Sequence, residues 1–138
     1  MNIRIINGPN LGTLGRREPA LYGTVPFEEY FPILVERYPQ HGLSFFQSDE
    51  EGTLVRALQQ AGNECDAIIL NAGAFTHTSL AVADAVRSLG IPVIEVHLTH
   101  IFARESFRHC SYLTPVCKGL VSGLGLDGYR LAVEHLIQ

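Results

Sequence analysis

The chain has 138 residues, of which 46% are hydrophobic and 17% are charged, so it is expected to be globular and not disordered. Its formal net charge is −4, and its arginines are scattered apart from Arg16 and Arg17, which argues against a nucleic-acid partner. From Met1 the sequence runs into a strand-like segment, with no charged leader, long apolar stretch or lipidation motif. We therefore expect a single domain, residues 1–138, that works in the cytoplasm on small molecules and binds no membrane.

Two residue types limit the chemistry. Cys65, Cys110 and Cys117 are odd in number and lack CxxC spacing, so we expect reduced thiols. Lys118 is the only lysine. Any mechanism that needs a Schiff base therefore depends on this one residue, which directly precedes the last predicted strand.

Five short runs rich in Ile, Val, Leu and Phe recur along the chain. They cover residues 3–7, 43–47, 67–71, 92–97 and 119–123. Their almost continuous apolar character predicts strands that are buried on both faces of a parallel sheet.

Helical patterns separate the first three runs. Residues 26–38 are predicted to form a helix that Pro32 kinks or restarts, because proline removes a backbone donor. Residues 49–62 are predicted to form a second helix, with Ser48 or Asp49 as its cap.

Glycine and aspartate mark the ends of the remaining helical patterns. Gly62 is expected to end the second helix. A third helix, residues 79–90, is expected to stop at Gly90. A fourth, residues 127–137, is expected to begin behind Asp127 as its cap.

Strands and helices alternate throughout, which predicts an α/β three-layer sandwich with right-handed crossovers. For five strands the best prediction is a flavodoxin-like parallel sheet of order 2-1-3-4-5. In that order the winding reverses between strands 1 and 3, and ligands bind beyond the carboxyl ends of the strands at this point. The loops after strands 1, 3 and 4 should converge there.

The loop after the first strand, residues 7–23, is long for a connection between a strand and a helix, and long ordered loops tend to be functional. Its second half, residues 15–23, is expected to be too irregular for a helix or a strand. Its glycines match neither GxGxxG nor GxxxxGK[ST], and it contains no lysine that could bind a nucleotide phosphate. A dinucleotide or nucleoside triphosphate site is therefore disfavoured.

The loop after the third strand, "NAGAFTHTS", offers Asn71 at the strand end and His77 in the first turn of the next helix. Residues 76–79 are predicted to open this helix. The free amide groups at the start of a helix can attract an oxyanion or a carboxylate. The plainer interpretation is an ordinary helix cap with His77 on the surface.

The loop after the fourth strand contains acid, imidazole and guanidinium groups. Glu95 and His97 are two residues apart on a strand, so they share a face, and the carboxylate can fix the tautomer of the imidazole and raise its basicity. Arg104 and Arg108 are four residues apart, so in a helix both could face one anion, or they could form a solvated face. The possible metal ligands His97, His100, His109 and Cys110 match no standard zinc spacing.

Together the three loops supply two carboxamides, two imidazoles, two guanidiniums and one phenol. The residues are Asn10, Asn71, His77, His97, Arg17, Arg108 and Tyr22. This set suits acid–base chemistry on a small, hydroxylated carboxylate, and the absence of a GxSxG motif gives acyl transfer little support. A lyase or isomerase acting on a hydroxy acid, and a flavodoxin-like binding or signalling module, both stay open at this point.

Three long motifs resemble the type II 3-dehydroquinate dehydratases, in the same order and over nearly the whole chain. They are "INGPNLGTLGRREPALYG", "ILNAGAFTHTSLAVADA" and "PVIEVHLTHIFARESFRHCSYLTPV". The resemblance implies a flavodoxin-like fold, a homododecamer built as four trimers, and no cofactor. It also implies the substrate, 3-dehydroquinate, which loses water to give 3-dehydroshikimate in the shikimate pathway.

The resemblance further implies four catalytic residues. Tyr22 would remove the proton from the carbon next to the ketone, and Arg17 would hold Tyr22 as a phenolate. Asn10, with a bound water, would stabilise the enolate. His97 would donate a proton to the departing hydroxyl.

The remaining implied roles concern substrate binding. Asn71, His77 and Arg108 would hold the substrate hydroxyls, and the backbone amides of Leu98 and Thr99 its carboxylate. Asp84 would reach the site of a neighbouring subunit. The segment "LTHIFAR" departs from the usual "SNIHAR", which leaves the role of Arg104 open.

Overall fold

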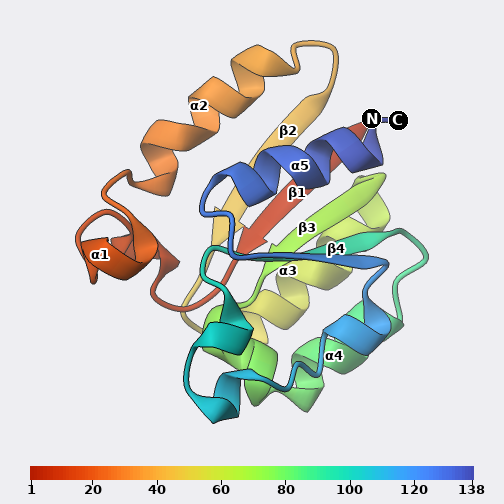
Figure 1. Cartoon of the computed structure of the whole chain (residues 1–138). Coiled ribbons are helices and arrows are strands. Elements are labelled where there is room, and N and C mark those ends of the chain that lie inside the picture. Colours follow the sequence, from red (N-terminus) through yellow and green to blue (C-terminus); the bar gives the residue numbers. More distant parts are fainter.

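The computed structural model describes residues 1–138 and contains one five-stranded sheet (Figure 1). The strands are β1 (Asn2–Asn7), β2 (Gly42–Gln47), β3 (Ala67–Asn71), β4 (Val93–His97) and β5 (Gly119–Ser122). All four strand pairs are parallel, and their order is β2-β1-β3-β4-β5. The predicted flavodoxin-like α/β fold is therefore confirmed, with every strand boundary within one residue of its prediction.

Helices cover both faces of the sheet. They are α1 (Pro19–Tyr22), α2 (Phe27–Arg37), α3 (Glu51–Glu64), α4 (Leu80–Arg87) and α5 (Asp127–Leu136). Figure 1 shows α2 and α5 on one face and α3 and α4 on the other. The layers therefore follow the βαβ crossovers that the alternating pattern predicts.

Alternate residues of the central strands pack into two separate hydrophobic cores. Ile5 and Ile69 belong to the core beneath α2 and α5, whereas Ile6 and Ile68 belong to the core beneath α3 and α4. Successive strand side chains point to opposite faces, so a central strand of a three-layer fold must be apolar at almost every position. This is why the strands are visible in the sequence as continuous apolar runs.

The predicted ends of α3 are wrong on both sides. Its N-cap is Glu50, and the Ser48 hydroxyl accepts a hydrogen bond from the Glu50 amide one step before the helix. The helix runs past Gly62 to Glu64, because the Cys65 amide still donates to a carbonyl of the last turn. Glycine weakens a helix by about 1 kcal/mol, and tertiary packing can override such a cost.

The start of α4 confirms the interpretation as an ordinary helix cap, whereas its end differs from prediction. Ser79 is the N-cap, and its hydroxyl accepts a hydrogen bond from the Val82 amide at 3.0 Å. His77 therefore lies outside this helix, at the end of a preceding 3₁₀ segment, Gly73–His77. The helix stops at Arg87, three residues before Gly90.

Three further local predictions need correction. Pro32 lies inside α2, which continues through it as one helix and does not restart. Asp127 is the first residue of α5 and not its cap, and its carboxylate pairs with Arg130 one turn later. The loop after β1, expected to be irregular over residues 15–23, contains the short helix α1, which starts at Pro19.

The three cysteines are free thiols, as predicted. No helix of the chain combines the length and the apolar character that crossing a membrane requires.

Candidate active site

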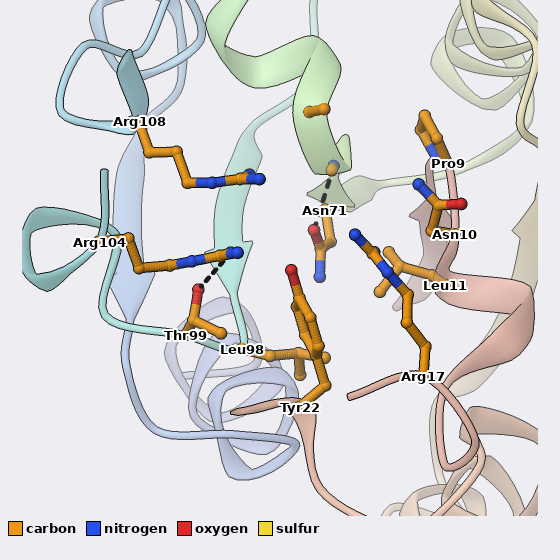
Figure 2. Close-up of a pocket in the computed structure, with 12 residues that line it drawn as sticks. Pro9, Asn10, Leu11, Arg17, Tyr22, Asn71, Leu98, Thr99, Arg104 and Arg108 are labelled. Atoms are coloured by element: carbon orange, nitrogen blue, oxygen red, sulfur yellow. Dashed lines mark hydrogen bonds between the residues drawn. The ribbon is translucent and has the colours of Figure 1, made fainter. Parts of the chain in front are cut away.

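A cleft opens where the loops after β1, β3 and β4 converge, as the strand order predicts (Figure 2). It encloses about 450 Å³, including the open solvent at its mouth. Its lining residues are Pro9, Asn10, Leu11, Arg17, Tyr22, Asn71, Gly73, Ala74, Leu98, Thr99, Arg104 and Arg108. Seven of the ten predicted site residues are therefore brought together, and three are not.

Tyr22 stands between two guanidinium groups at the centre of this cleft. The Cζ atom of Arg17 lies 4.9 Å from the centroid of the Tyr22 ring, and that of Arg104 lies 5.3 Å from it. Figure 2 shows Arg17 on one side of the Tyr22 hydroxyl and Arg104 on the other. The Tyr22 side chain therefore lies in a strongly positive part of the cleft.

The cleft is positively charged although the chain as a whole is acidic. Arg17, Arg104 and Arg108 line it, and no aspartate or glutamate does. Glu105 lies beside it, with its carboxylate 2.9 Å from Arg108 Nε and 3.7 Å from Arg104 Nε, and it is about half exposed. Glu18, which is also more than half exposed, lies 3.8 Å from Arg17 Nε. Three guanidiniums against two exposed carboxylates outside the lining leave net positive charge, which suits the binding of an anion.

The two arginines after β4 reach the cleft in a different way from the one predicted. They do not share a helix, because their segment forms two separate 3₁₀ turns, Ile101–Ala103 and Ser106–Arg108. Arg104 sits between them in extended conformation and donates to Thr99 Oγ1 at 3.3 Å. Both side chains nevertheless extend toward Tyr22 and Asn71 in Figure 2.

Asn71, at the end of β3, is held by a hydrogen-bond network beneath the cleft. Its Nδ2 donates to the Tyr129 hydroxyl at 3.0 Å, and its Oδ1 accepts from the Gly73 amide at 3.3 Å. The Tyr129 hydroxyl in turn donates to Asn7 Oδ1 at 2.7 Å. Burial raises the pKa of Tyr129, which keeps it a neutral donor. The ends of β1 and β3 are thereby tied together under the site.

Glu95 and His97 form a buried pair on β4, which confirms that they share a face. His97 Nε2 lies 2.5 Å from Glu95 Oε2, and both side chains are almost inaccessible to solvent. Because an ionised carboxylate can only accept, the proton of this hydrogen bond sits on Nε2, and Nδ1 is left for other partners. Glu95 therefore fixes the orientation and the tautomer of His97.

Glu95 stays ionised despite its burial. Burial alone would raise its pKa, but hydrogen bonds from His97, Thr114 and Ser111 together hold the pKa of this carboxyl below its usual range. A carboxyl whose pKa is lower in the folded protein stabilises the fold above its ordinary pKa. This contribution is lost as the pH falls through the lowered value.

The Glu95→Gln variant is expected to lower the free energy of unfolding by about 1–3 kcal/mol at neutral pH, because a charged acceptor of three hydrogen bonds is lost. The difference from wild type should persist above the ordinary carboxyl pKa of 4.5 and shrink below it. Urea denaturation across this pH range would measure it. Glu36→Gln, an exposed change on α2, serves as the control, and equal losses in both variants would contradict the assignment.

Three predicted residues, His97, His77 and Asp84, do not line the cleft. His97 is 5% exposed and lies directly before the lining residue Leu98. The His77 ring stacks on the His97 ring with 6.2 Å between centroids, and its Nδ1 is 2.7 Å from the Cys110 carbonyl oxygen. Burial, together with nearby His97 and Arg108, lowers the pKa of His77 despite the opposing Cys110 hydrogen bond.

Asp84 is exposed on α4 and pairs with Arg87 at 3.2 Å.

The backbone after β4 presents two free donors. Neither the Leu98 amide nor the Thr99 amide donates a hydrogen bond to any group of the chain, although both residues are buried and line the cleft. Buried amides without a partner are rare in proteins. Two adjacent N–H groups of this kind form a ready site for an anionic oxygen.

The chain has no cluster of metal ligands, and its only lysine is far from the cleft. No three side chains among its His, Cys, Asp and Glu residues are grouped so that they could hold a metal ion. Lys118 directly precedes β5, at the amino end of the strand, whereas the cleft lies at the carboxyl ends.

The sequence did not point to several residues of the site. Pro9, Leu11, Gly73 and Ala74 contribute to the walls, and their only signal is their place in the functional loops. Tyr129 carries no signal at all, since its hydroxyl meets partners on strands far away in the sequence.

Comparison with known proteins places this arrangement in context. Residues 1–137 match the family model described as Dehydroquinase class II. A 3-dehydroquinate dehydratase of Bacillus licheniformis is 48% identical over 138 residues, which cover 99% of this chain and 95% of that protein. A 3-dehydroquinate dehydratase of Mycobacterium tuberculosis is 45% identical over 138 residues, which cover 99% of this chain and 94% of that protein.

Solved structures agree with the sequence comparison. The type II dehydroquinase from Butyrivibrio crossotus superposes with a TM-score of 0.96 at 40% identity and covers 100% of this chain and 98% of its own. A 3-dehydroquinate dehydratase-like protein from Bifidobacterium longum superposes with a TM-score of 0.69 at 26% identity, with 99% and 98% covered.

Proposed function

Because the chain belongs to the class II dehydroquinase family, a family of hydro-lyases, we propose that it acts as a 3-dehydroquinate dehydratase of the shikimate pathway. In this reaction a C–H bond next to the ketone and a C–O bond to a hydroxyl break. A carbon–carbon double bond forms, and 3-dehydroshikimate and water leave. The observation that carries the proposal is Tyr22 between Arg17 and Arg104, in a cleft that no acidic residue lines.

Tyr22 is the base in this proposal. Its phenolate removes the proton next to the ketone, and Arg17 holds it in the phenolate form. A guanidinium at about 4 Å in an effective dielectric near 20 favours an anion by about 4 kcal/mol. A proton on carbon is weakly acidic, so a base poised in its anionic form near neutral pH is what the step requires.

Arg104 is a second guanidinium for the same phenolate. It faces Tyr22 at nearly the distance of Arg17 and is the less exposed of the two, since its side chain is 13% accessible against 37%. Its hydrogen bond to Thr99 holds it in place. We therefore assign to Arg104 a share of the electrostatic stabilisation.

The proposal assigns the substrate's other groups to backbone amides and polar side chains in and beside the cleft. We assign its carboxylate to the amides of Leu98 and Thr99, an assignment that their lack of any partner within the chain supports. Asn71, His77 and Arg108 would bind its hydroxyls.

Asn10, with a water, would stabilise the enolate oxygen. Charge develops on this oxygen only as the C–H bond breaks, so a donor aimed at it lowers the barrier more than it strengthens substrate binding.

His97 is the acid in this proposal. Hydroxide leaves poorly, and a proton transferred to it in the transition state contributes on the order of a hundredfold or more. The Glu95 carboxylate accepts from Nε2 and leaves Nδ1 available to the substrate. His97 lies outside the lining of the cleft and directly precedes the lining residue Leu98.

We extend the proposal to the cellular setting and the assembly. Residues 1–138 would act as one catalytic domain in the cytoplasm, a reducing compartment that suits three free cysteines. The enzyme would be a homododecamer of four trimers, in which Asp84 completes the site of a neighbouring subunit. The exposure of Asp84 outside its own chain's cleft supports this role.

The test is an ultraviolet assay. Adding 3-dehydroquinate to the purified protein should produce the absorbance of the conjugated enone of 3-dehydroshikimate. No rise at any pH would refute the proposal. Because the mechanism uses neither a metal nor an imine, turnover should survive chelators and borohydride, whereas inactivation by borohydride with substrate present would point to Lys118.

A further inference from the structure

The start of the loop after β1 is attached to the end of β2 by two side chains that the proposed mechanism does not use. Asp49 Oδ1 accepts a hydrogen bond from the Asn10 amide at 2.9 Å and another from Gln47 Nε2 at 3.1 Å. Gln47 Nε2 also lies 3.2 Å from the carbonyl oxygen of Gly8. These contacts join segments that are 39 residues apart in the sequence.

These contacts fix an uncommon backbone conformation at Asn10. Its φ is 69° and its ψ is −4°, in the left-handed region, which asparagine adopts more readily than most residues other than glycine. The Asp49 carboxylate holds its amide, and Thr13 donates to its carbonyl oxygen through both its amide and its hydroxyl, at 3.2 and 2.8 Å. Backbone conformation sets the direction of a side chain, so these contacts determine where the Asn10 carboxamide lies among the cleft residues of Figure 2.

We propose that Asp49 is a positioning residue for the reaction: it fixes the left-handed backbone of Asn10 and thereby holds the Asn10 carboxamide where the enolate oxygen forms. The inference rests on the proposed function, which gives Asn10 that role. Asp49 does not line the cleft, so it acts through Asn10 and not on the substrate. A donor that is displaced by a fraction of an ångström stabilises the transition state less, while the ground state loses little.

The chain contains a matched control. Asp66 Oδ2 accepts a hydrogen bond from the Asn2 amide at 2.6 Å, at the amino end of β1, away from the cleft. It is exposed, as Asp49 is, and it also joins segments distant in the sequence. If Asp49 had only a structural role, Asp49→Ala and Asp66→Ala should affect the enzyme alike.

Steady-state kinetics of five variants tests the proposal. Asp49→Ala should lower kcat about tenfold with KM within about twofold, because a transition-state contact is misaligned. Asp49→Asn should keep most of kcat, since its side-chain oxygen still accepts the Asn10 amide. Asp66→Ala should leave kcat unchanged, and Asn10→Ala/Asp49→Ala should be no slower than Asn10→Ala alone.

Hydrogen–deuterium exchange of the peptide that contains Asn10 gives a readout independent of activity. The Asn10 amide should exchange about tenfold faster in Asp49→Ala than in wild type. In Asp66→Ala it should exchange at the wild-type rate. Unchanged kcat in Asp49→Ala, an equal fall in Asp66→Ala, or additive losses with Asn10→Ala would overturn the inference. A wild-type enzyme without turnover would instead refute the proposed function, and unchanged exchange in Asp49→Ala would still refute the attachment.

Discussion

The Tyr22→Phe variant is expected to lose about 10³-fold in kcat, because it lacks the proposed base and general-base catalysis contributes about 10² to 10⁴. KM should change little, since the phenyl ring that packs between Arg17 and Arg104 is retained. The enone assay measures both constants. The fold should be intact, because the Tyr22 hydroxyl makes no hydrogen bond within the chain that phenylalanine would lose.

Tyr112→Phe is the matched control for this prediction. Tyr112 is exposed, lies outside the cleft, and loses the same single hydroxyl. Its kcat should equal that of wild type. Thermal unfolding of both variants should match wild type, so that lost turnover cannot be attributed to lost structure. If Tyr22→Phe kept more than about a tenth of kcat, the base would have to be another group.

The fold was predictable from the sequence because its central strands are buried on both faces. Residues 3–7 contain three isoleucines, and residues 67–71 are apolar except for Asn71. Apolar runs of this short length that are rich in β-branched residues are typical of strands buried on both faces. Helix ends were less predictable. Gly62 is a strong local stop signal, yet α3 passes it, because the hydrogen bond from Cys65 and the packing of the last turn decide the boundary.

Site residues were predictable where the chemistry is local to one strand end or one loop. Asn71 and His97 end adjacent strands, so the strand order alone brings them near the same edge of the sheet. Tyr129 was not predictable, since its hydroxyl meets Asn7 across 122 residues of sequence. Asp49 looked like a helix cap, and only the folded chain puts its carboxylate on Asn10. Contacts of this kind depend on tertiary structure, which no periodicity in the sequence encodes.

The Arg17→Ala variant is expected to lower kcat/KM on the order of a hundredfold at neutral pH. A guanidinium near a phenolate in an effective dielectric of about 20 stabilises it by several kcal/mol, and about 2.7 kcal/mol corresponds to a hundredfold. The partial exposure of Arg17 and the second guanidinium of Arg104 keep the loss below that of Tyr22→Phe. Steady-state rates from the enone assay give the ratio directly.

The pH profile distinguishes an electrostatic role from a structural one. In the proposed mechanism Arg17 stabilises the Tyr22 phenolate. We therefore expect the acidic limb of the kcat/KM profile of Arg17→Ala to move to higher pH, and activity to return in part as the pH rises. Arg16→Ala is the control, because Arg16 is the exposed neighbour and does not line the cleft, and its profile should match wild type. A hundredfold loss in Arg17→Ala that is the same at every pH would mean that Arg17 binds substrate and does not activate Tyr22. An upward shift would tie the two side chains to one proton transfer.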